Sequence, residues 1–319
     1  MENVDYTDAN VLLFDRTGPV LRQTMSVLNM LGFKSFADVQ ELEAVQQILA
    51  NQRVDVAILA LEAADCGVLK LIDNIRHRRC GLDPFLPILL TAWDARLKSV
   101  RLVIDSGVDD MLLHPFSINQ MRERIEGLIN ARKPFVVTED YFGPDRRATS
   151  GIQADPSSII VPNALLARTR NRPDVAPSSE RIETAFSGLR RLKLRNMARR
   201  IWYLTNCLNE ALPEPALIHR YEDELTKVRG SIRKYENTLL PEDDGNLAVL
   251  CKSLSGALAK LFGRPPDAEG LKLLEQKALA LRVASKLDNE QSDSGDVIRG
   301  EKVAKINNVE EDLVQAVMG

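Results

Sequence analysis

The sequence predicts an α/β domain with a five-stranded parallel sheet, followed by an all-α helical bundle. Up to residue 133, short apolar runs alternate with segments whose apolar residues recur at helical spacing, as in repeated βα units. From about residue 180 the helical spacing continues, and no strand-like run interrupts it. Because successive βα units form a parallel sheet that helices cover on both faces, the first part is expected to be doubly wound.

Five apolar runs have the length and composition of strands. They are NVLLF (10–14), SFADV (35–39), VAILAL (56–61), PILLTA (87–92) and DMLLH (110–114). VAILAL and PILLTA lack the polar alternation of a half-exposed strand, so both of their faces are expected to be buried. The carboxyl ends of parallel strands meet at one edge of the sheet, where such folds bind their ligands. The residues at that edge are therefore candidates for function.

Residues 180–287 are expected to form a four-helix bundle, because helical segments are separated there by short, helix-breaking turns such as PEP (213–215). One segment carries apolar residues at alternating three- and four-residue steps, which marks a narrow seam along a helix. The seam residues are Ile218, Tyr221, Leu225, Val228, Ile232, Tyr235 and Leu239. We expect neighbouring helices of the same chain to bury this seam.

Residues 134–179 are expected to be a linker between a domain at 8–133 and the bundle. They mix proline, glycine, serine and charged residues without lasting periodicity. Within them, RTRNRPDVAPSS (168–179) is expected to be flexible. Residues 288–319 are expected to be a polar tail with a short amphipathic helix.

The segment EDYFGPDRR (139–147) lies within this expected linker. It combines aromatic, turn-forming and basic residues. It could dock on a domain surface, it could bind an acidic partner through Arg146 and Arg147, or it could be an exposed turn. The sequence leaves these alternatives open.

The composition is that of a soluble globular protein, with 45% hydrophobic and 27% charged residues and a formal net charge of −3. No apolar run approaches the roughly 18 residues that a membrane span needs, and the first ten residues lack the features of a secretory signal. We therefore expect a cytoplasmic protein that does not enter a membrane. The cysteines show no metal-ligand spacing and the three histidines do not cluster, so no metal or other cofactor is expected.

At the carboxyl edge, the strand-end residues follow an order that resembles the receiver domain of two-component response regulators. Asp15, Ala60, Thr91 and His114 are separated by 45, 31 and 23 residues, close to the family's spacing. The segment SGVDDMLLHPF (106–116) resembles the end of such a domain. The resemblance covers about the first 130 residues. It implies a flavodoxin-like, CheY-like fold and a bacterial signalling protein in a phosphorelay-type pathway.

The family's phosphorylation chemistry needs an aspartate nucleophile, an acidic pair that binds Mg²⁺, a hydroxyl group and a lysine. By the resemblance, Ala60 stands at the nucleophile position, and an alanine methyl group cannot accept a phosphoryl group. Phe14 replaces one member of the acidic pair, so that only Asp15 remains. His114 replaces the lysine. The sequence therefore predicts a pseudo-receiver that takes no phosphoryl group on an aspartate.

Other positions at this edge have more than one interpretation. Thr91 keeps the family's hydroxyl, and Met111 replaces the aromatic residue that responds to phosphorylation. The resemblance implies a cis peptide bond before Pro115. Glu62 with Asp15 could hold a divalent cation, although a solvated loop acid is the simpler interpretation. His114 could sense pH or accept a phosphoryl group, or it could simply fill the space of the lysine.

The leading functional hypothesis is a signalling protein, not an enzyme, whose helical half acts by contact with a protein partner. No glycine-rich phosphate loop or catalytic motif is present in the sequence. An alternative is a DNA-binding regulator that uses the basic segment 189–200, which also fits a solvated face for an acidic partner. Its basic residues include Arg190, Arg191, Lys193, Arg195, Arg199 and Arg200. A third hypothesis is a histidine phosphotransfer protein that uses His219, although Glu222 and Asp223 would repel a phosphoryl group there.

Overall fold

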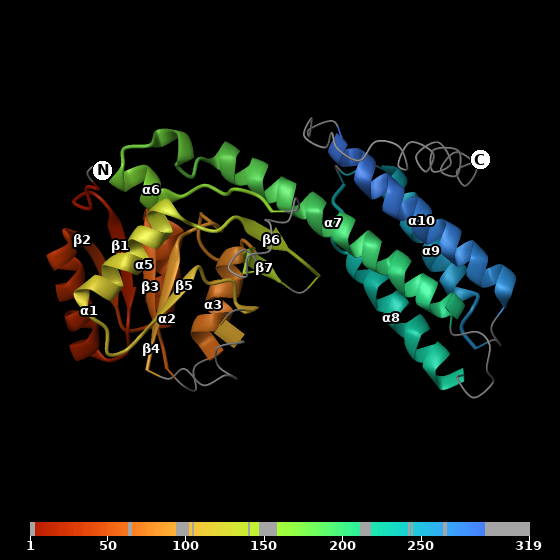
Figure 1. Cartoon of the computed structure of the whole chain (residues 1–319), viewed down its shortest axis with the longest axis horizontal. Helices are drawn as coiled ribbons and strands as arrows, with labels where there is room; N and C mark the ends of the chain where they lie inside the picture. Colours follow the sequence, from red (N-terminus) through yellow and green to blue (C-terminus); the bar gives the residue numbers. More distant parts are fainter. Residues whose placement is uncertain are drawn as a thin grey trace. The chain divides into compact units, whose positions relative to one another are not determined.

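The structure, a computed structural model, divides into two units, Met1–Leu189 and Arg190–Gly319 (Figure 1). It describes residues 4–62, 66–93, 102, 103, 105–139, 141–146, 158–210, 218–241, 243, 245–263 and 267–290.

A five-stranded parallel sheet forms the centre of the first unit, with the strand order β2-β1-β3-β4-β5. Its strands are β1 (Asn10–Phe14), β2 (Ser35–Val39), β3 (Val56–Leu61), β4 (Ile88–Ala92) and β5 (Asp110–Leu113). Each of the five predicted strands is confirmed, with bounds that differ by no more than one residue. This strand order is that of the flavodoxin-like doubly wound fold.

Both faces of the sheet are covered by helices, which confirms the doubly wound prediction. Alternate side chains of β1 point to opposite faces, as the strand geometry requires. Val11 and Leu13 pack with α1 (Gly18–Leu31) and α5 (Ile118–Asn130). Leu12 and Phe14 pack with α2 (Leu42–Asn51) and α3 (Cys66–Arg76) on the other face. The apolar run NVLLF is thus buried on two sides because it is a central strand.

A capping box fixes the point at which α5 begins. The Gln120 backbone N–H donates to Ser117 Oγ at 3.2 Å, and the Ser117 N–H donates to Gln120 Oε1 at 2.8 Å. These two bonds satisfy donors that the first helical turn leaves open. The turn from β5 into α5 contains the cis peptide bond between His114 and Pro115, as the resemblance implied.

The structure corrects the expected linker at 134–179. Its described residues include an antiparallel hairpin of β6 (Phe135–Val137) and β7 (Phe142–Pro144). Every residue of these two strands is buried within the first unit. Strands of three residues are too short to show a period in the sequence, so their burial had no visible signal.

The segment that follows the hairpin also belongs to the first unit. The helix α6 (Ala164–Thr169) packs against α5, and the Asn163 side chain joins the two by donating to the Leu128 carbonyl at 2.8 Å. The expected flexible stretch 168–179 instead contains the end of α6 and the short 3₁₀ helix η2 (Pro173–Val175). The first unit therefore ends at Leu189, well beyond the predicted boundary at residue 133.

The second unit is helical, as predicted. It contains the later part of α7 (Ser179–Glu210), together with α8 (Ile218–Glu236), α9 (Gly245–Ala259) and α10 (Ala268–Glu290). One cluster of buried apolar side chains draws on all of these helices. The described part of the chain holds no helix that is both long enough and apolar enough to cross a bilayer.

The seam of α8 is buried in this cluster. Tyr221, Leu225, Val228, Ile232 and Tyr235 are each at most 4% exposed. The Tyr235 hydroxyl forms a hydrogen bond of 2.8 Å with Ser285 Oγ of α10. The Ile218 side chain, the turn at 213–215 and the tail from residue 291 onward lie outside the described residues.

Candidate functional site

The carboxyl edge of the sheet brings the predicted pocket residues together. Asp15 follows β1, Ala60 lies near the end of β3, and His114 follows β5. Thr91 of β4 is the register partner of Ala60 and is buried. Because β1, β3, β4 and β5 are consecutive neighbours in the sheet, these four positions form a row along its edge. The methyl group of Ala60 occupies the place between the carboxylate and the hydroxyl.

Asp15 is the one carboxylate of the expected acidic pair. Its side chain is buried, and its Oδ1 accepts a hydrogen bond of 2.7 Å from the Thr17 backbone N–H. Burial raises the pKa of Asp15, the Thr17 hydrogen bond and the nearby His114 oppose the rise, and the charge of Glu62 adds to it. Asp15 is therefore held by the local backbone of the β1–α1 turn.

His114 is part of a stack of aromatic rings. Its imidazole lies nearly parallel to the Trp93 indole, with ring centroids 4.5 Å apart and planes at 13°. The Phe116 ring also lies close to it, with ring centroids 4.6 Å apart and planes at 43°. Burial lowers the pKa of His114, although Asp15 opposes the shift, so the ring is neutral at pH 7. Among the described residues, no partner accepts or donates a hydrogen bond at its buried Nε2.

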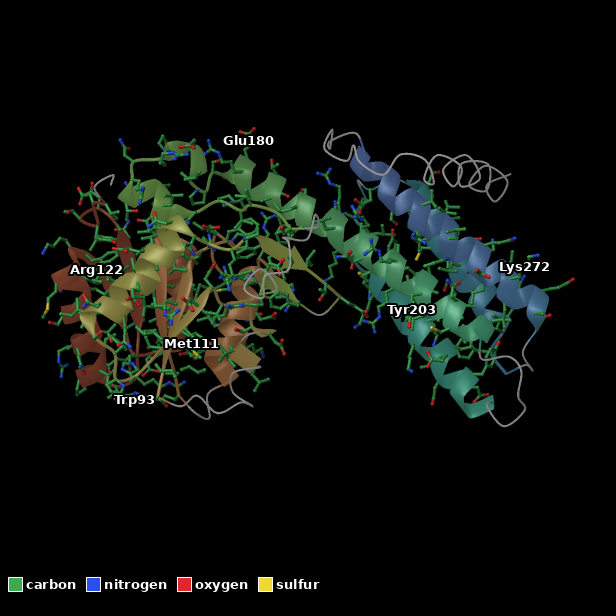
Figure 2. All side chains as sticks on the ribbon, viewed as in Figure 1. Trp93, Met111, Arg122, Glu180, Tyr203 and Lys272 are labelled. Atoms are coloured by element: carbon green, nitrogen blue, oxygen red, sulfur yellow. The ribbon has the colours of Figure 1, made fainter. Side chains whose placement is uncertain are left out.

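Phe14 and Met111 face the core. Phe14 is 2% exposed and packs with the apolar residues of α2 and α3, and Met111 packs against the same cluster. Neither residue brings a polar group to the edge. Figure 2 labels Met111 on β5 and Trp93 just after the end of β4.

The charged and polar groups of the row are few. In the described part of the chain, no group of three or more His, Cys, Asp or Glu side chains is placed to hold a metal ion. Glu62 is exposed, and its charge repels that of Asp15. A neutral His114 cannot offset the charge of a phosphoryl group as a lysine would.

The sequence analysis missed Trp93 and Phe116. Trp93 is 65% exposed, so it adds an exposed aromatic side chain to the carboxyl edge. The available signal was position: each aromatic residue follows a strand-end motif directly, Trp93 after PILLTA and Phe116 after His-Pro. The contact of Trp93 with His114 depends on β4 and β5 being neighbours, which the sequence does not show directly, whereas Phe116 is only two residues from His114.

The segment EDYFGPDRR docks on the first unit. Phe142 lies against the rings of His77, Phe85 and Phe186, and the Tyr141 hydroxyl donates to the Pro144 carbonyl at 2.8 Å. Arg146 donates to the backbone carbonyls of Val108 and Asp109. Arg146 is therefore engaged in the fold, which favours docking among the three alternatives that the sequence left open. Arg147 lies outside the described residues.

The basic residues of α7 divide into two groups. Arg190 forms an ion pair with Asp243 inside the second unit, so it is a structural residue. Lys193 and Arg195 are half-buried, whereas Arg191, Arg199 and Arg200 are exposed. Fewer basic side chains of this segment are exposed than the sequence suggested. His219 lies in α8, but its side chain is outside the described residues.

A buried ionic network at the opposite, amino edge of the sheet was also missed. Arg76 is fully buried and donates to Asp109 Oδ2 at 2.8 Å and to the carbonyls of Gly107, Pro84 and Leu86. Arg132 donates to Asp109 Oδ1 at 2.8 Å. Burial alone would raise the pKa of Asp109, but the guanidinium groups of Arg132 and Arg76 outweigh it and hold the pKa below its usual value.

The network holds the β6–β7 hairpin. The ring of Phe135 in β6 lies beside both guanidinium groups, with the Cζ atoms of Arg76 and Arg132 each 5.2 Å from its centroid. Cation–π contacts of desolvated arginines contribute about 2 kcal/mol or more. The amino edge is thus a structural site that joins the hairpin to the sheet.

Comparison with solved structures shows similarity to receiver domains over the N-terminal part of the chain. A CheY-like receiver domain protein from Methanospirillum hungatei is 16% identical, with a TM-score of 0.33, over 37% of this chain and 90% of its own. A receiver protein from Pseudomonas putida is 22% identical, with a TM-score of 0.33, over 37% of this chain and 95% of its own. An orphan response regulator of H. pylori is 19% identical, with a TM-score of 0.32, over 38% and 95%.

No family model and no curated protein matches the chain. The similarity to solved structures is one of fold alone. It does not extend to the helical part. The N-terminal part of the chain has the fold of a CheY-like response-regulator receiver domain, and its C-terminal part is a helical unit without a recognised family.

Proposed function

We propose that this chain is a signal-transduction protein of the two-component type whose receiver-like unit works without phosphorylation of an aspartate. The observation that carries the proposal is the register pair of Ala60 and Thr91, which puts a methyl group where a nucleophile would stand. The neutral, stacked His114 supports it, because a neutral ring does not supply the positive charge that a lysine would bring to phosphoryl transfer at this position.

In this proposal the carboxyl edge binds a protein partner, and phosphorylation does not alter that surface. Trp93 is 65% exposed, and Leu113, at 37%, is exposed at the end of β5. Exposed tryptophan side chains are frequent anchors of protein–protein contacts, since they bury a large apolar area with few rotatable bonds. His114 holds the Trp93 indole from one face, which reduces the conformational entropy that binding would cost. The chain has no enzymatic role in this proposal.

The proposal is tested by incubation of the full chain with Mg²⁺ and acetyl phosphate, followed by intact-mass measurement. The wild type is expected to keep its mass, because no carboxylate stands at the Ala60 position. A mass gain of one phosphoryl group that hydroxylamine removes would refute the proposal.

Variants make this test more specific. In Ala60→Asp alone, little phosphorylation is expected, since His114 and Phe14 still replace the lysine and the second acid. In Ala60→Asp combined with His114→Lys, the gain should be larger, because the lysine can offset phosphoryl charge. Thermal unfolding of both variants checks that the first unit remains folded.

A second candidate function is supported by the exposure of Arg191, Arg199 and Arg200 on α7. These side chains could contact nucleic-acid phosphates. Mobility-shift assays at two salt concentrations, with the wild type and Arg191→Glu/Arg199→Glu, decide between the functions. Binding that falls steeply with salt and is lost in the variant favours a DNA-binding regulator. Weak binding that is the same in both chains leaves protein contact as the function.

A further inference from the structure

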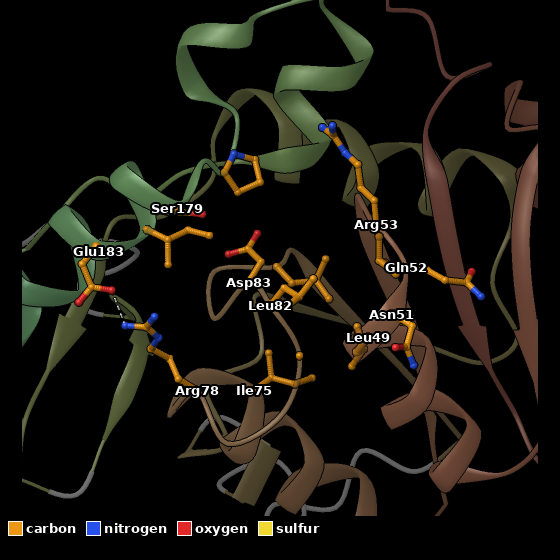
Figure 3. Close-up of a pocket in the computed structure, with 15 residues that line it drawn as sticks. Leu49, Asn51, Gln52, Arg53, Ile75, Arg78, Leu82, Asp83, Ser179 and Glu183 are labelled. Atoms are coloured by element: carbon orange, nitrogen blue, oxygen red, sulfur yellow. Dashed lines mark hydrogen bonds and ion pairs between the residues drawn. The ribbon is translucent and has the colours of Figure 1, made fainter.

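A pocket of about 520 Å³ lies at the amino edge of the sheet in the first unit (Figure 3). Its walls come from the residues that precede β3 and β4 and from the start of α7. Leu49, Ile75, Leu82 and Ile182 make much of its surface apolar. The pocket therefore lies at the opposite edge from Ala60, and the proposed function does not use it.

One polar group in the pocket has an unmet hydrogen-bonding requirement. Asp83 Oδ1 accepts a hydrogen bond of 2.8 Å from the Phe85 backbone N–H. Its Oδ2 is buried and has no hydrogen-bond partner among the described residues. Figure 3 shows the Asp83 carboxylate among the residues that line the pocket. A buried carboxylate oxygen without a donor destabilises the folded chain, because it has lost its hydration and gained no hydrogen bond in return.

The surrounding charges favour a donor that the protein does not itself supply. Burial raises the pKa of Asp83, and the guanidinium groups of Arg132 and Arg76 oppose that rise. Both arginines direct their hydrogen bonds elsewhere, to Asp109 and to backbone carbonyls. They lower the electrostatic cost of the Asp83 charge, but they do not donate to Oδ2.

The rim of the pocket does not exclude a cation. Arg53 is paired with Asp55 at 3.1 Å, and Arg78 is paired with Glu183 at 2.7 Å. Each rim guanidinium thus has a carboxylate partner, so its positive charge is offset locally. A ligand with a positive head group can then approach Asp83 without large repulsion from the rim.

We infer that this pocket binds a small organic cation, a primary ammonium group on a short apolar body, with the ammonium donating to Asp83 Oδ2. The apolar body lies against Leu49, Ile75 and Leu82. Pockets that bind small molecules combine such apolar walls with a few polar groups that fix orientation. Because Ile182 and Glu183 of α7 also line the pocket, the ligand would contact the helix that continues into the second unit.

The test uses three probes that share a hexyl chain and differ in the head group: hexylammonium, hexanol and hexanoate. Their affinities for the full chain are measured by isothermal titration calorimetry. We expect hexylammonium to bind about tenfold more tightly than hexanol, as a charge-assisted hydrogen bond would give, and hexanoate to bind least. Equal affinities for the three probes, or no binding of any probe, would overturn the inference.

Two variants separate the head-group contact from the apolar contact. Asp83→Asn keeps the acceptor for the Phe85 N–H and removes the charge, so the preference for hexylammonium over hexanol should disappear. Leu82→Ser removes an apolar wall at a residue that is 70% exposed, so hexylammonium and hexanol should weaken together. A preference for hexylammonium that survives in Asp83→Asn would contradict the assignment of Oδ2.

A blocking variant and a control complete the experiment. Ser179→Trp fills the pocket from an exposed position and leaves Asp83 in place, so it tests the site even if Asp83→Asn does not fold. We expect it to abolish hexylammonium binding. Asp38→Asn changes an exposed aspartate of β2 outside the pocket, and its affinities should equal those of the wild type. Undiminished hexylammonium binding by Ser179→Trp would place the ligand elsewhere and refute the inference.

Discussion

The two edges of the parallel sheet use charged residues in different ways. At the carboxyl edge, Asp15 is held by a backbone N–H, and His114 is a neutral ring in an aromatic stack. At the amino edge, Arg76, Arg132 and Asp109 form a buried network in which both carboxylate oxygens accept hydrogen bonds. The difference shows that the buried ion pairs of the amino edge join parts of the fold, whereas the buried carboxylate of the carboxyl edge is held by its local backbone.

The amino edge is also where the backbone packs most closely. Gly107 has a φ of +83°, and a Cβ at this position would lie 2.5 Å from the Phe142 carbonyl oxygen of β7. Glycine is required there both for its backbone conformation and for its lack of a side chain. The hairpin and the network are therefore parts of one structural site.

The largest expected effect comes from Asp109→Ala at the amino edge. It leaves Arg76 and Arg132 buried without their carboxylate, and breaking a buried pair in this way costs about 3–5 kcal/mol. Urea unfolding followed by circular dichroism measures the change. The matched control is Asp110→Ala, whose ion pair with Arg124 is partly exposed, so its loss should cost less than about 1 kcal/mol. Similar costs for the two variants would show that the network is not a structural site.

A smaller effect is expected from Gly107→Ala. The added methyl group meets the Phe142 carbonyl and the left-handed backbone is strained, which together should cost about 1–3 kcal/mol. Limited proteolysis should then cut the hairpin sooner than in the wild type. The control is Gly127→Ala in α5, where an added Cβ would have no atom within 4 Å. This substitution should leave the stability unchanged or raise it by up to about 1 kcal/mol. An unchanged rate of cleavage in Gly107→Ala would mean that the hairpin is not held by this close contact.

The smallest effect concerns His114 at the carboxyl edge. Burial lowers its pKa, so the folded state favours the neutral ring. The stability that this ring contributes is therefore present above its ordinary pKa of 6.5 and is lost as the pH falls below that value. From pH 7 to pH 5, the unfolding temperature of the wild type should fall more than that of His114→Gln.

Trp93 fluorescence reports the same titration. In a Trp202→Phe background, Trp93 is the remaining tryptophan of the two in the chain, and protonation of the stacked imidazole should quench it. The midpoint of the quenching is expected below pH 6.5, and it should vanish in His114→Gln. A midpoint at or above 6.5 would indicate a solvated ring and would remove the contrast between the two edges.

The sequence alone was sufficient to predict much of the fold. The strand VAILAL could be predicted because it is a continuous apolar run of strand length, and the seam of α8 because its apolar residues recur at a helical period. The place of Ala60 near the end of β3 was also predicted from the sequence, whereas the loss of a nucleophile there stays a prediction.

Other features depended on residues that are distant in the chain, and only the tertiary structure decided them. Arg76 and Asp109 lie 33 positions apart, so their ion pair could not be predicted from neighbouring residues. The β6–β7 hairpin is too short to show a period, so its docking and the boundary at Leu189 could not be predicted either. The stack of Trp93 on His114 and the pocket around Asp83 likewise need the strand order that brings their segments together. A helical or strand pattern lies within one segment of the sequence, whereas the partners of a buried charge depend on how distant elements pack together.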